Sequence, residues 1–201
     1  MFNDLRFAFR QLLKSPGFSA VALLTLALGI GVNSALFNVV NSILFRPPGY
    51  ADPETLVDVY ETAPGFRYAT TSYPNYLDVR DQNRSFSGLA LYQLQSFGFS
   101  RGGESRSLWA EVVSGNYFEV LGVSTRLGRG FDARQDDVVG AAPVVVLSHA
   151  FWEREFGADP RVLGTSIRLN GVPFEVIGVA PPSFRGMIRG LVAQVWIPAT
   201  A

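Results

Sequence analysis

The most pronounced pattern in the chain is a long, mainly apolar stretch over residues 18–45. No charged side chain lies between Lys14 and Arg46, and the stretch exceeds the about 20 residues that a helix needs to cross a bilayer. Pro16 suits the first turn of a helix, and the two prolines after Arg46 cannot continue one. The pattern therefore predicts a transmembrane helix in residues 16–46, long enough for its end to project as a stalk.

The charges on either side of this stretch predict its orientation. Arg6, Arg10 and Lys14 precede it, whereas acidic residues are mixed with arginines in the sequence that follows. Because positive charge is retained on the cytoplasmic side of a membrane segment, we expect a cytoplasmic N-terminus and a single pass through the cell inner membrane. A cleaved signal peptide begins in a similar way, but its apolar region covers only about 7–15 residues.

Residues 1–15 predict an amphipathic helix at the cytoplasmic membrane surface. Apolar residues recur at helical spacing on one face, and basic residues lie four apart on another. The apolar positions are Phe2, Leu5, Phe9 and Leu12, and the basic positions are Arg6, Arg10 and Lys14. Such a helix places its apolar side in membrane lipid and its cations among the phosphates. A positively charged topology signal explains the same residues, and the sequence leaves both interpretations open.

A stripe of small and polar residues follows one face of the predicted transmembrane helix. Its members are Ala27, Gly31, Ser34, Asn38 and Asn41. Small residues let another helix approach closely, and asparagine amides form hydrogen bonds across such an interface. We therefore expect further transmembrane helices, or a second copy of the chain, to pack there. The alternative is that Asn38 and Asn41 lie in the headgroup layer or in the stalk.

Residues 47–201 alternate between strand and helix patterns and predict one α+β domain. Ser148 and Gly157 suit the start and end of a helix. Asn170-Gly171 is a strong hairpin signal, although Pro173 moves the start of the second strand outward or toward an edge. The expected strands are 56–60, 89–99, 107–113, 144–147, 166–169 and 174–179, and the expected helices are 73–81, one turn carrying Tyr117, Phe118 and Leu121, and 149–156.

Composition excludes several classes of function. Basic and acidic residues balance at 17 each, so no overall field attracts nucleic acid, and no nucleic-acid partner is expected. The chain has no Cys, which excludes disulfides, thiolate metal sites and a Cys nucleophile. Lys14 is the sole lysine and lies outside any glycine-rich loop, so a Walker-type phosphate loop is excluded as well. We expect no cofactor.

One short motif matches the sequence pattern of a catalytic serine. The sequence around Ser100 matches G-x-S-x-G, and His149 with Asp132, Asp136 or Asp137 gives the remaining partners of a hydrolase triad. That motif requires a helix directly after the serine, whereas the residues after Ser100 have turn composition. We therefore interpret it as part of a hairpin. His149 is the only histidine, so no His cluster binds a metal, and the paired aspartates are typical of a solvated loop.

Three segments carry a resemblance to a known family. They are LRFAFRQLLKSPGFSAVALLTLALGIGVNSALF at 5–37, SGNYFEVLGVSTRLGRGF at 114–131 and PVVVLSHAFWEREFGADPRVLGTSIRLNGVPFEVIGVAPPSF at 143–184. In this order they resemble the periplasmic core domain of MacB-type ABC transporter permeases, and the first resembles the duplicated orphan permeases of that family. The resemblance extends over almost the whole chain.

The resemblance implies a function. The chain looks like the N-terminal part of an exporter permease, with the first transmembrane helix, an incomplete periplasmic core domain at 47–201, and three further membrane helices beyond its end. A separate cytoplasmic ATPase is implied, whose ATP-driven dimer motions the permease transmits to the periplasmic domain, and no catalytic residues are implied. Two alternatives are a membrane-anchored periplasmic sensing or adaptor domain and an anchored hydrolase that uses Ser100 and His149.

Overall fold

The computed structural model describes residues 10, 14–44, 49–101, 104–188 and 190–201. The chain divides into two compact units, a helical unit at 1–46 and a core unit at 47–201. Most of the predicted surface helix at 1–15 lies outside the described residues. The long apolar stretch forms α2 (Pro16–Leu44), and its part Pro16–Asn38 is long and apolar enough to cross a membrane.

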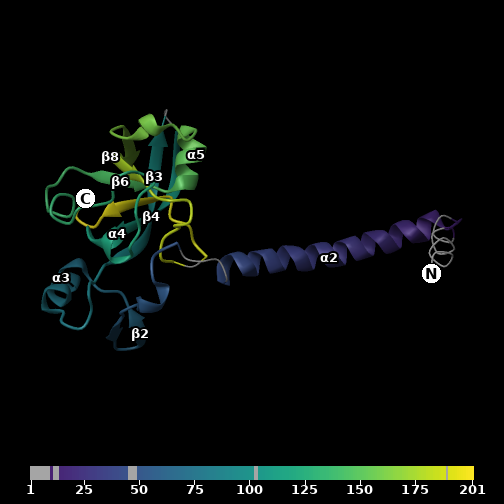
Figure 1. Cartoon of the computed structure of the whole chain (residues 1–201), viewed down its shortest axis with the longest axis horizontal. Helices are drawn as coiled ribbons and strands as arrows, with labels where there is room; N and C mark the ends of the chain where they lie inside the picture. The colour runs from purple at the N-terminus through teal and green to yellow at the C-terminus, as the bar shows by residue number, and fades with distance from the viewer. Residues whose placement is uncertain (1–9, 11–13, 45–48, 102–103, 189) are drawn as a thin grey trace. The chain divides into compact units, whose positions relative to one another are not determined.

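The core unit alternates short helices and strands (Figure 1), which confirms the predicted mixed fold class. In chain order its elements are η1 (Pro53–Thr55), β1 (Glu61–Ala63), β2 (Phe66–Ala69), α3 (Tyr73–Gln82), β3 (Tyr92–Arg101), β4 (Glu104–Val113), α4 (Tyr117–Val120), β5 (Leu127–Gly128), β6 (Val144–Leu147), α5 (His149–Phe156), η2 (Pro160–Val162), β7 (Ser166–Leu169), β8 (Val172–Val179) and β9 (Val195–Pro198).

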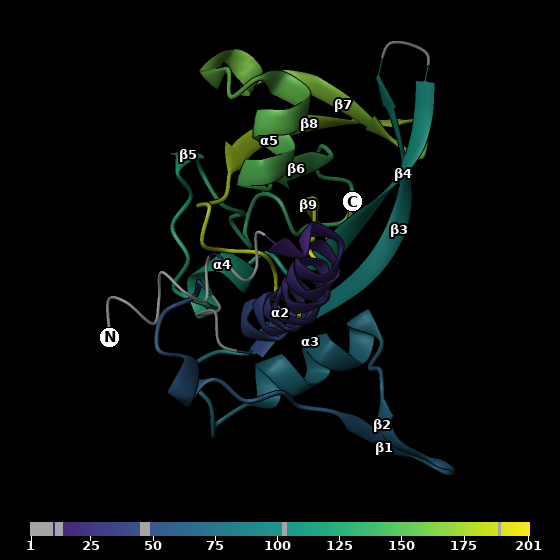
Figure 2. The same cartoon turned by 90° about the vertical axis from the view of Figure 1, so that its right-hand side faces the viewer.

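Six strands of the core unit close into a small barrel. The hydrogen-bonded order is β8-β6-β9-β4-β3-β7, and β7 pairs in turn with β8. Leu169 makes the closure, because it lies opposite Phe99 on β3 and opposite Val172 on β8. The β4–β9 and β6–β8 pairs are parallel, and β5 adds to the end of β8. Figure 2 shows β3 and β4 as one long curved ribbon.

The barrel interior holds the larger of two apolar cores. Strand side chains alternate between the interior and the outer face, and the interior set includes Phe99, Leu108, Val145, Leu169, Val176 and Val195. α5 adds Phe151 and Trp152 to this core, and the rings of Phe99 and Phe151 meet edge to face at 5.2 Å. The helix that the sequence predicts at 149–156 therefore packs against the barrel and helps to bury its core.

A second core lies on the outer face of β4, β6 and β9. It gathers Tyr117 and Phe118 of α4, Phe184 of the loop after β8, and Trp196 of β9. The rings of Phe184 and Trp196 stack at 5.1 Å with an interplanar angle of 27°. This core fixes the long loop between β8 and β9 against the barrel.

The segment from η1 to α3 forms a smaller layer beside the barrel (Figure 2). Tyr76 of α3 is buried, and its hydroxyl donates to the Leu89 carbonyl at 3.0 Å and to Asn116 Oδ1 at 3.2 Å. The Tyr92 hydroxyl on β3 donates to Asp58 Oδ1 at 2.8 Å. Tyrosine hydroxyls on both sides therefore join this layer to the barrel.

One predicted strand is wrong. Residues 56–60 form no strand, and the two-stranded sheet β1–β2 begins only at Glu61. Leu56 instead packs against the second core, and Asp58 accepts the hydrogen bond from Tyr92. The alternating pattern of this segment therefore reflects one side anchored to the barrel and one side exposed, without a partner strand.

Candidate functional site

The residues of the predicted packing stripe all lie on α2 and are exposed within this chain. Two neighbouring polar groups are satisfied inside the helix, because Thr25 Oγ1 donates to the Val21 carbonyl and Asn33 Nδ2 to the Gly29 carbonyl, at 2.8 and 2.9 Å. Asn38 lies at the end of the membrane-length part of α2, and Asn41 lies beyond it. The stripe remains a prediction about partners outside this chain.

The structure places the catalytic-looking motif in a hairpin. Ser100 is the penultimate residue of β3, opposite Ser105 of β4 and Arg168 of β7. His149 opens α5, where its Nδ1 lies 3.3 Å from Glu153 Oε2 and its ring meets Trp152 edge to face. The sharp strand-to-helix turn that a serine nucleophile elbow requires is therefore replaced by a strand-to-strand connection.

A buried carboxylate that sequence reasoning missed lies at the centre of the second core. Glu111 alternates with the interior residues Ala110 and Val112 on β4, so its side chain enters the outer-face core, where it is 1% exposed. Its Oε2 accepts from the Tyr117 hydroxyl at 2.8 Å and from Trp196 Nε1 at 2.7 Å. The sequence alone does not reveal this role, because the donors to Glu111 come from segments far from it in the chain.

The other carboxylate oxygen holds the loop between β8 and β9. Oε1 accepts from the Met187 N–H at 2.9 Å, and the Ile188 N–H also bonds to the carboxylate. Burial raises the pKa of Glu111 above its usual value, and the hydrogen bonds to the carboxylate oppose that shift without cancelling it. Gly186 lies so close that a Cβ atom there would be 2.4 Å from Oε1. The loop is thus built around this side chain.

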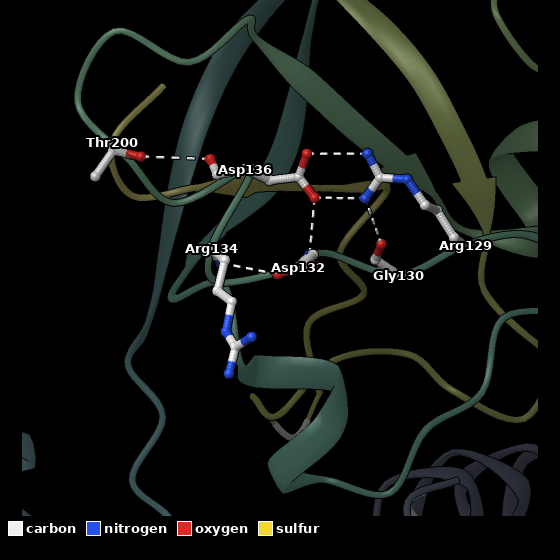
Figure 3. Close-up of polar contacts among 6 residues, drawn as sticks. All are labelled: Arg129, Gly130, Asp132, Arg134, Asp136 and Thr200. Carbon is white, nitrogen blue, oxygen red and sulfur yellow. Dashed lines mark hydrogen bonds and ion pairs between the residues drawn. The ribbon is translucent and has the colours of Figure 1, made fainter.

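A second polar cluster closes the loop between β5 and β6 (Figure 3). Asp136 is buried and accepts from the two terminal guanidinium nitrogens of Arg129, at 2.5 and 3.0 Å, and from the Asp132 N–H at 2.8 Å. Burial alone raises the pKa of Asp136, but the bonds from Arg129 and Asp132 outweigh it and lower the pKa. The expectation of a solvated aspartate pair is therefore wrong for Asp136, because an arginine neutralises it in the folded chain.

Asp137 connects this loop to three other segments. Its carboxylate accepts from the Gly115 N–H at 2.8 Å and from the Thr200 hydroxyl at 3.2 Å. It also accepts a hydrogen bond from Tyr73 of α3, and burial together with this bond raises the pKa of Tyr73. Within the described part of the chain, no three His, Asp or Glu side chains gather as metal ligands would.

An open groove of about 420 Å³ lies beside β8, between β5 and the turn that precedes β7. Its lining consists of Gly128, Arg129, Leu163, Gly164, Glu175, Val176 and Ile177. Several polar groups around it are already used, because Arg129 binds Asp136 and the carbonyls of Val176 and Ile177 accept from the Gly164 and Arg129 N–H groups. The groove therefore offers few free polar groups for recognition.

A family model for the MacB-like periplasmic core domain matches residues 19–201 of this chain. The chain belongs to this family. The match includes most of α2 and the whole core unit, so the resemblance that the sequence suggests is confirmed.

Proteins similar to the chain include macrolide export ATP-binding/permease proteins MacB. The protein from Shigella dysenteriae is 35% identical over 89 residues, and that from Salmonella paratyphi A is 40% identical over 91 residues. Each match covers 44% of this chain and 13% of the relative. The periplasmic region of MacB from Actinobacillus actinomycetemcomitans is 22% identical, with a TM-score of 0.49 and coverage of 62% of this chain and 55% of that structure.

Proposed function

We propose that this chain is the N-terminal part of a permease subunit of an ABC-type exporter in the cell inner membrane. In this proposal it transmits conformational change, driven by ATP at a separate cytoplasmic ATPase, to a periplasmic domain. The main support for the proposal is that one chain contains both an apolar helix long enough to cross a membrane and a MacB-like periplasmic core domain. Residues 1–15 are assigned to the cytoplasm, 16–46 to the membrane and 47–201 to the periplasm.

The construction of the core unit supports a mechanical role. Six of its strands close into a ring, and a closed sheet resists deformation better than an open one. Glu111 on β4 holds the loop before β9, and Asp137 holds the loop before β6 to Gly115 and Thr200. A domain built in this way moves as a body, which suits the transmission of movement from a membrane helix better than chemistry at a cleft.

The stripe on α2 is the proposed contact with other membrane helices. The chain lacks Cys, so a single cysteine at Ser34→Cys is a unique crosslinking site in the centre of the stripe. Leu36→Cys is the matched control, because two residues correspond to about 200° of rotation around a helix and place it on the opposite face. In native membranes, Ser34→Cys should crosslink to a partner helix or a second copy in several-fold higher yield.

The same crosslink tests the coupling to ATP. If a separate ATPase drives the permease, addition of ATP should change the yield from Ser34→Cys, and an ATPase subunit should copurify with the tagged protein. Equal crosslinking yields from Ser34→Cys and Leu36→Cys would show that the stripe is not the contact with other membrane helices. Failure to recover any ATPase with the protein from its native membranes would contradict the transport role itself.

A further inference from the structure

One asparagine of the core unit lies in an acceptor sequence for N-linked glycans. Glycosyl transfer to asparagine requires Asn-X-Ser or Asn-X-Thr, with any residue except Pro at X. Asn83, Arg84 and Ser85 match this pattern, and none of the other seven asparagines has Ser or Thr two positions later. A pattern this short also occurs by chance, so its place in the fold decides whether a transferase can use it.

The structure places this sequence on an exposed loop. Asn83 directly follows the last residue of α3, and residues 84–87 are all exposed. The connection to β3 is fixed to the rest of the core unit further along, where the Leu89 carbonyl accepts from the Tyr76 hydroxyl at 3.0 Å and from Asn116 Nδ2 at 2.8 Å. A bulky, hydrophilic glycan therefore has room at the start of the loop.

The Asn83 side chain forms a local turn within this loop. Its Oδ1 accepts from the Ser85 and Phe86 N–H groups, each at 3.0 Å, and its Nδ2 donates to the Phe86 carbonyl at 2.7 Å. All three bonds join Asn83 to exposed neighbours, so an enzyme can open the turn without disturbing either apolar core. The turn uses the N–H of Ser85 rather than its hydroxyl.

We propose that Asn83 is an N-glycosylation site of the core unit. The glycosyl donor is an oligosaccharide carried on a polyprenyl diphosphate at the periplasmic face of the membrane. Nδ2 of Asn83 forms a bond to the anomeric carbon of the first sugar, and the bond from that carbon to the diphosphate oxygen breaks. The diphosphate leaves with the electron pair, and Nδ2 gives up one proton to a base of the transferase.

Asp81 adds a recognition group two positions before the acceptor. Its side chain is 66% exposed, with Arg80 as an equally superficial partner at 2.8 Å, so a transferase can bind its carboxylate with a cationic side chain. The inference goes beyond the proposed transmission of movement. It rests only on the assignment of residues 47–201 to the periplasm.

The mass of the full protein, purified from the membranes of the cells that naturally make it, tests the site. We expect the chain to exceed its sequence mass by one glycan, with the added mass on the peptide that contains Asn83. Ser85→Ala should abolish the modification, because it removes the hydroxyl that transfer requires and keeps the N–H that the turn uses. Ser87→Ala is the matched control, since Ser87 is another exposed serine of this loop, and it should retain the glycan.

Two further measurements make the outcome decisive. Asp81→Asn should lower the occupancy of Asn83 several-fold, and unchanged occupancy would contradict the role of the Asp81 carboxylate. An Asn83 peptide without added mass, or a glycan that persists in Ser85→Ala, overturns the site. Labelling of Val139→Cys by an impermeant maleimide locates the core unit independently, because Val139 is 89% exposed. If that cysteine is labelled from outside and Asn83 is unmodified, the glycosylation site is wrong and the proposed function is untouched.

Discussion

At the scale of single residues, Glu111 joins parts of the core unit that are far apart in sequence. Its carboxylate accepts from Tyr117, Trp196, Met187 and Ile188. These donors are two aromatic side chains and two backbone N–H groups, all of them neutral. Among these donors, only hydrogen bonds stabilise the charged form of Glu111. Burial has the larger effect, so the pKa of Glu111 is raised. Two predictions follow from this arrangement.

The first concerns pH. Burial raises the pKa of Glu111 above 4.5, so the folded chain binds this proton more tightly than the unfolded chain. Its contribution to the free energy of unfolding is then fully present below about pH 4.5 and is lost as the pH rises through the raised pKa. Glu111→Gln does not titrate. The stability of the wild type relative to this variant should therefore fall as the pH rises from 4.5 to 7, measured by urea unfolding in micelles. A constant difference contradicts the assignment.

The second concerns two glycines of the same loop. Gly186 and Gly190 both have positive φ, at 95° and 85°, but only Gly186 touches Glu111. Alanine costs about 1–2 kcal/mol at either position because of its backbone strain. Gly186→Ala should cost about 1–3 kcal/mol more than Gly190→Ala, since it displaces a carboxylate that buried donors need. Thermal unfolding of both variants measures this difference, and equal losses would show that the loop yields around Glu111.

At the scale of elements, the sequence predicts best where local chemistry decides. α5 has the predicted bounds because Ser148 accepts from the Phe151 N–H and Gly157 takes a left-handed conformation. The β7–β8 hairpin forms around Asn170-Gly171 as predicted. β8 begins at Val172, so Pro173 does not move the start of the strand outward. Pro173 pairs with β7 alone and precedes the part that pairs with β6, which agrees with the expected edge position.

The elements that the sequence does not reveal depend on distant partners. β5 has only two residues, too few for a periodic signal. β9 is a strand because it fits between β4 and β6, in parallel with one and antiparallel to the other. Closure of the barrel and burial of Glu111 both require this strand, since Trp196 lies on it. Local sequence patterns therefore predict the separate hairpins and helices but not the barrel or the buried position of Glu111.

The two helix caps allow an element-scale prediction. The Ser148 hydroxyl lies in the buried start of α5, 3.2 Å from the Phe151 nitrogen, whereas the Ser72 hydroxyl caps α3 in an exposed position at 3.4 Å. Loss of a cap costs about 0.5–2 kcal/mol, and the buried case belongs at the upper end. Ser148→Ala should lower the free energy of unfolding by more than Ser72→Ala does, in paired urea titrations. The opposite order would mean that α5 is held by packing of Phe151 and Trp152 alone.

At the scale of the whole molecule, the proposal depends on which side of the membrane each unit occupies. Arg6, Arg10 and Lys14 precede α2, and this positive charge favours a cytoplasmic N-terminus. The core unit would then be periplasmic, where its movement can act on material outside the cytoplasm. Because the chain contains no Cys, single cysteines report each side without background labelling.

Two exposed positions suit this measurement. Val139 is 89% exposed on the core unit, and Ser15 is exposed just before α2. In intact spheroplasts a membrane-impermeant maleimide should label Val139→Cys almost completely and Ser15→Cys only after lysis, because the bilayer excludes the reagent from the cytoplasm. Labelling of both before lysis would mean that α2 does not span the membrane. The reverse pattern would place the core unit in the cytoplasm, beside the ATPase rather than across the membrane from it, and α2 could not then carry movement outward.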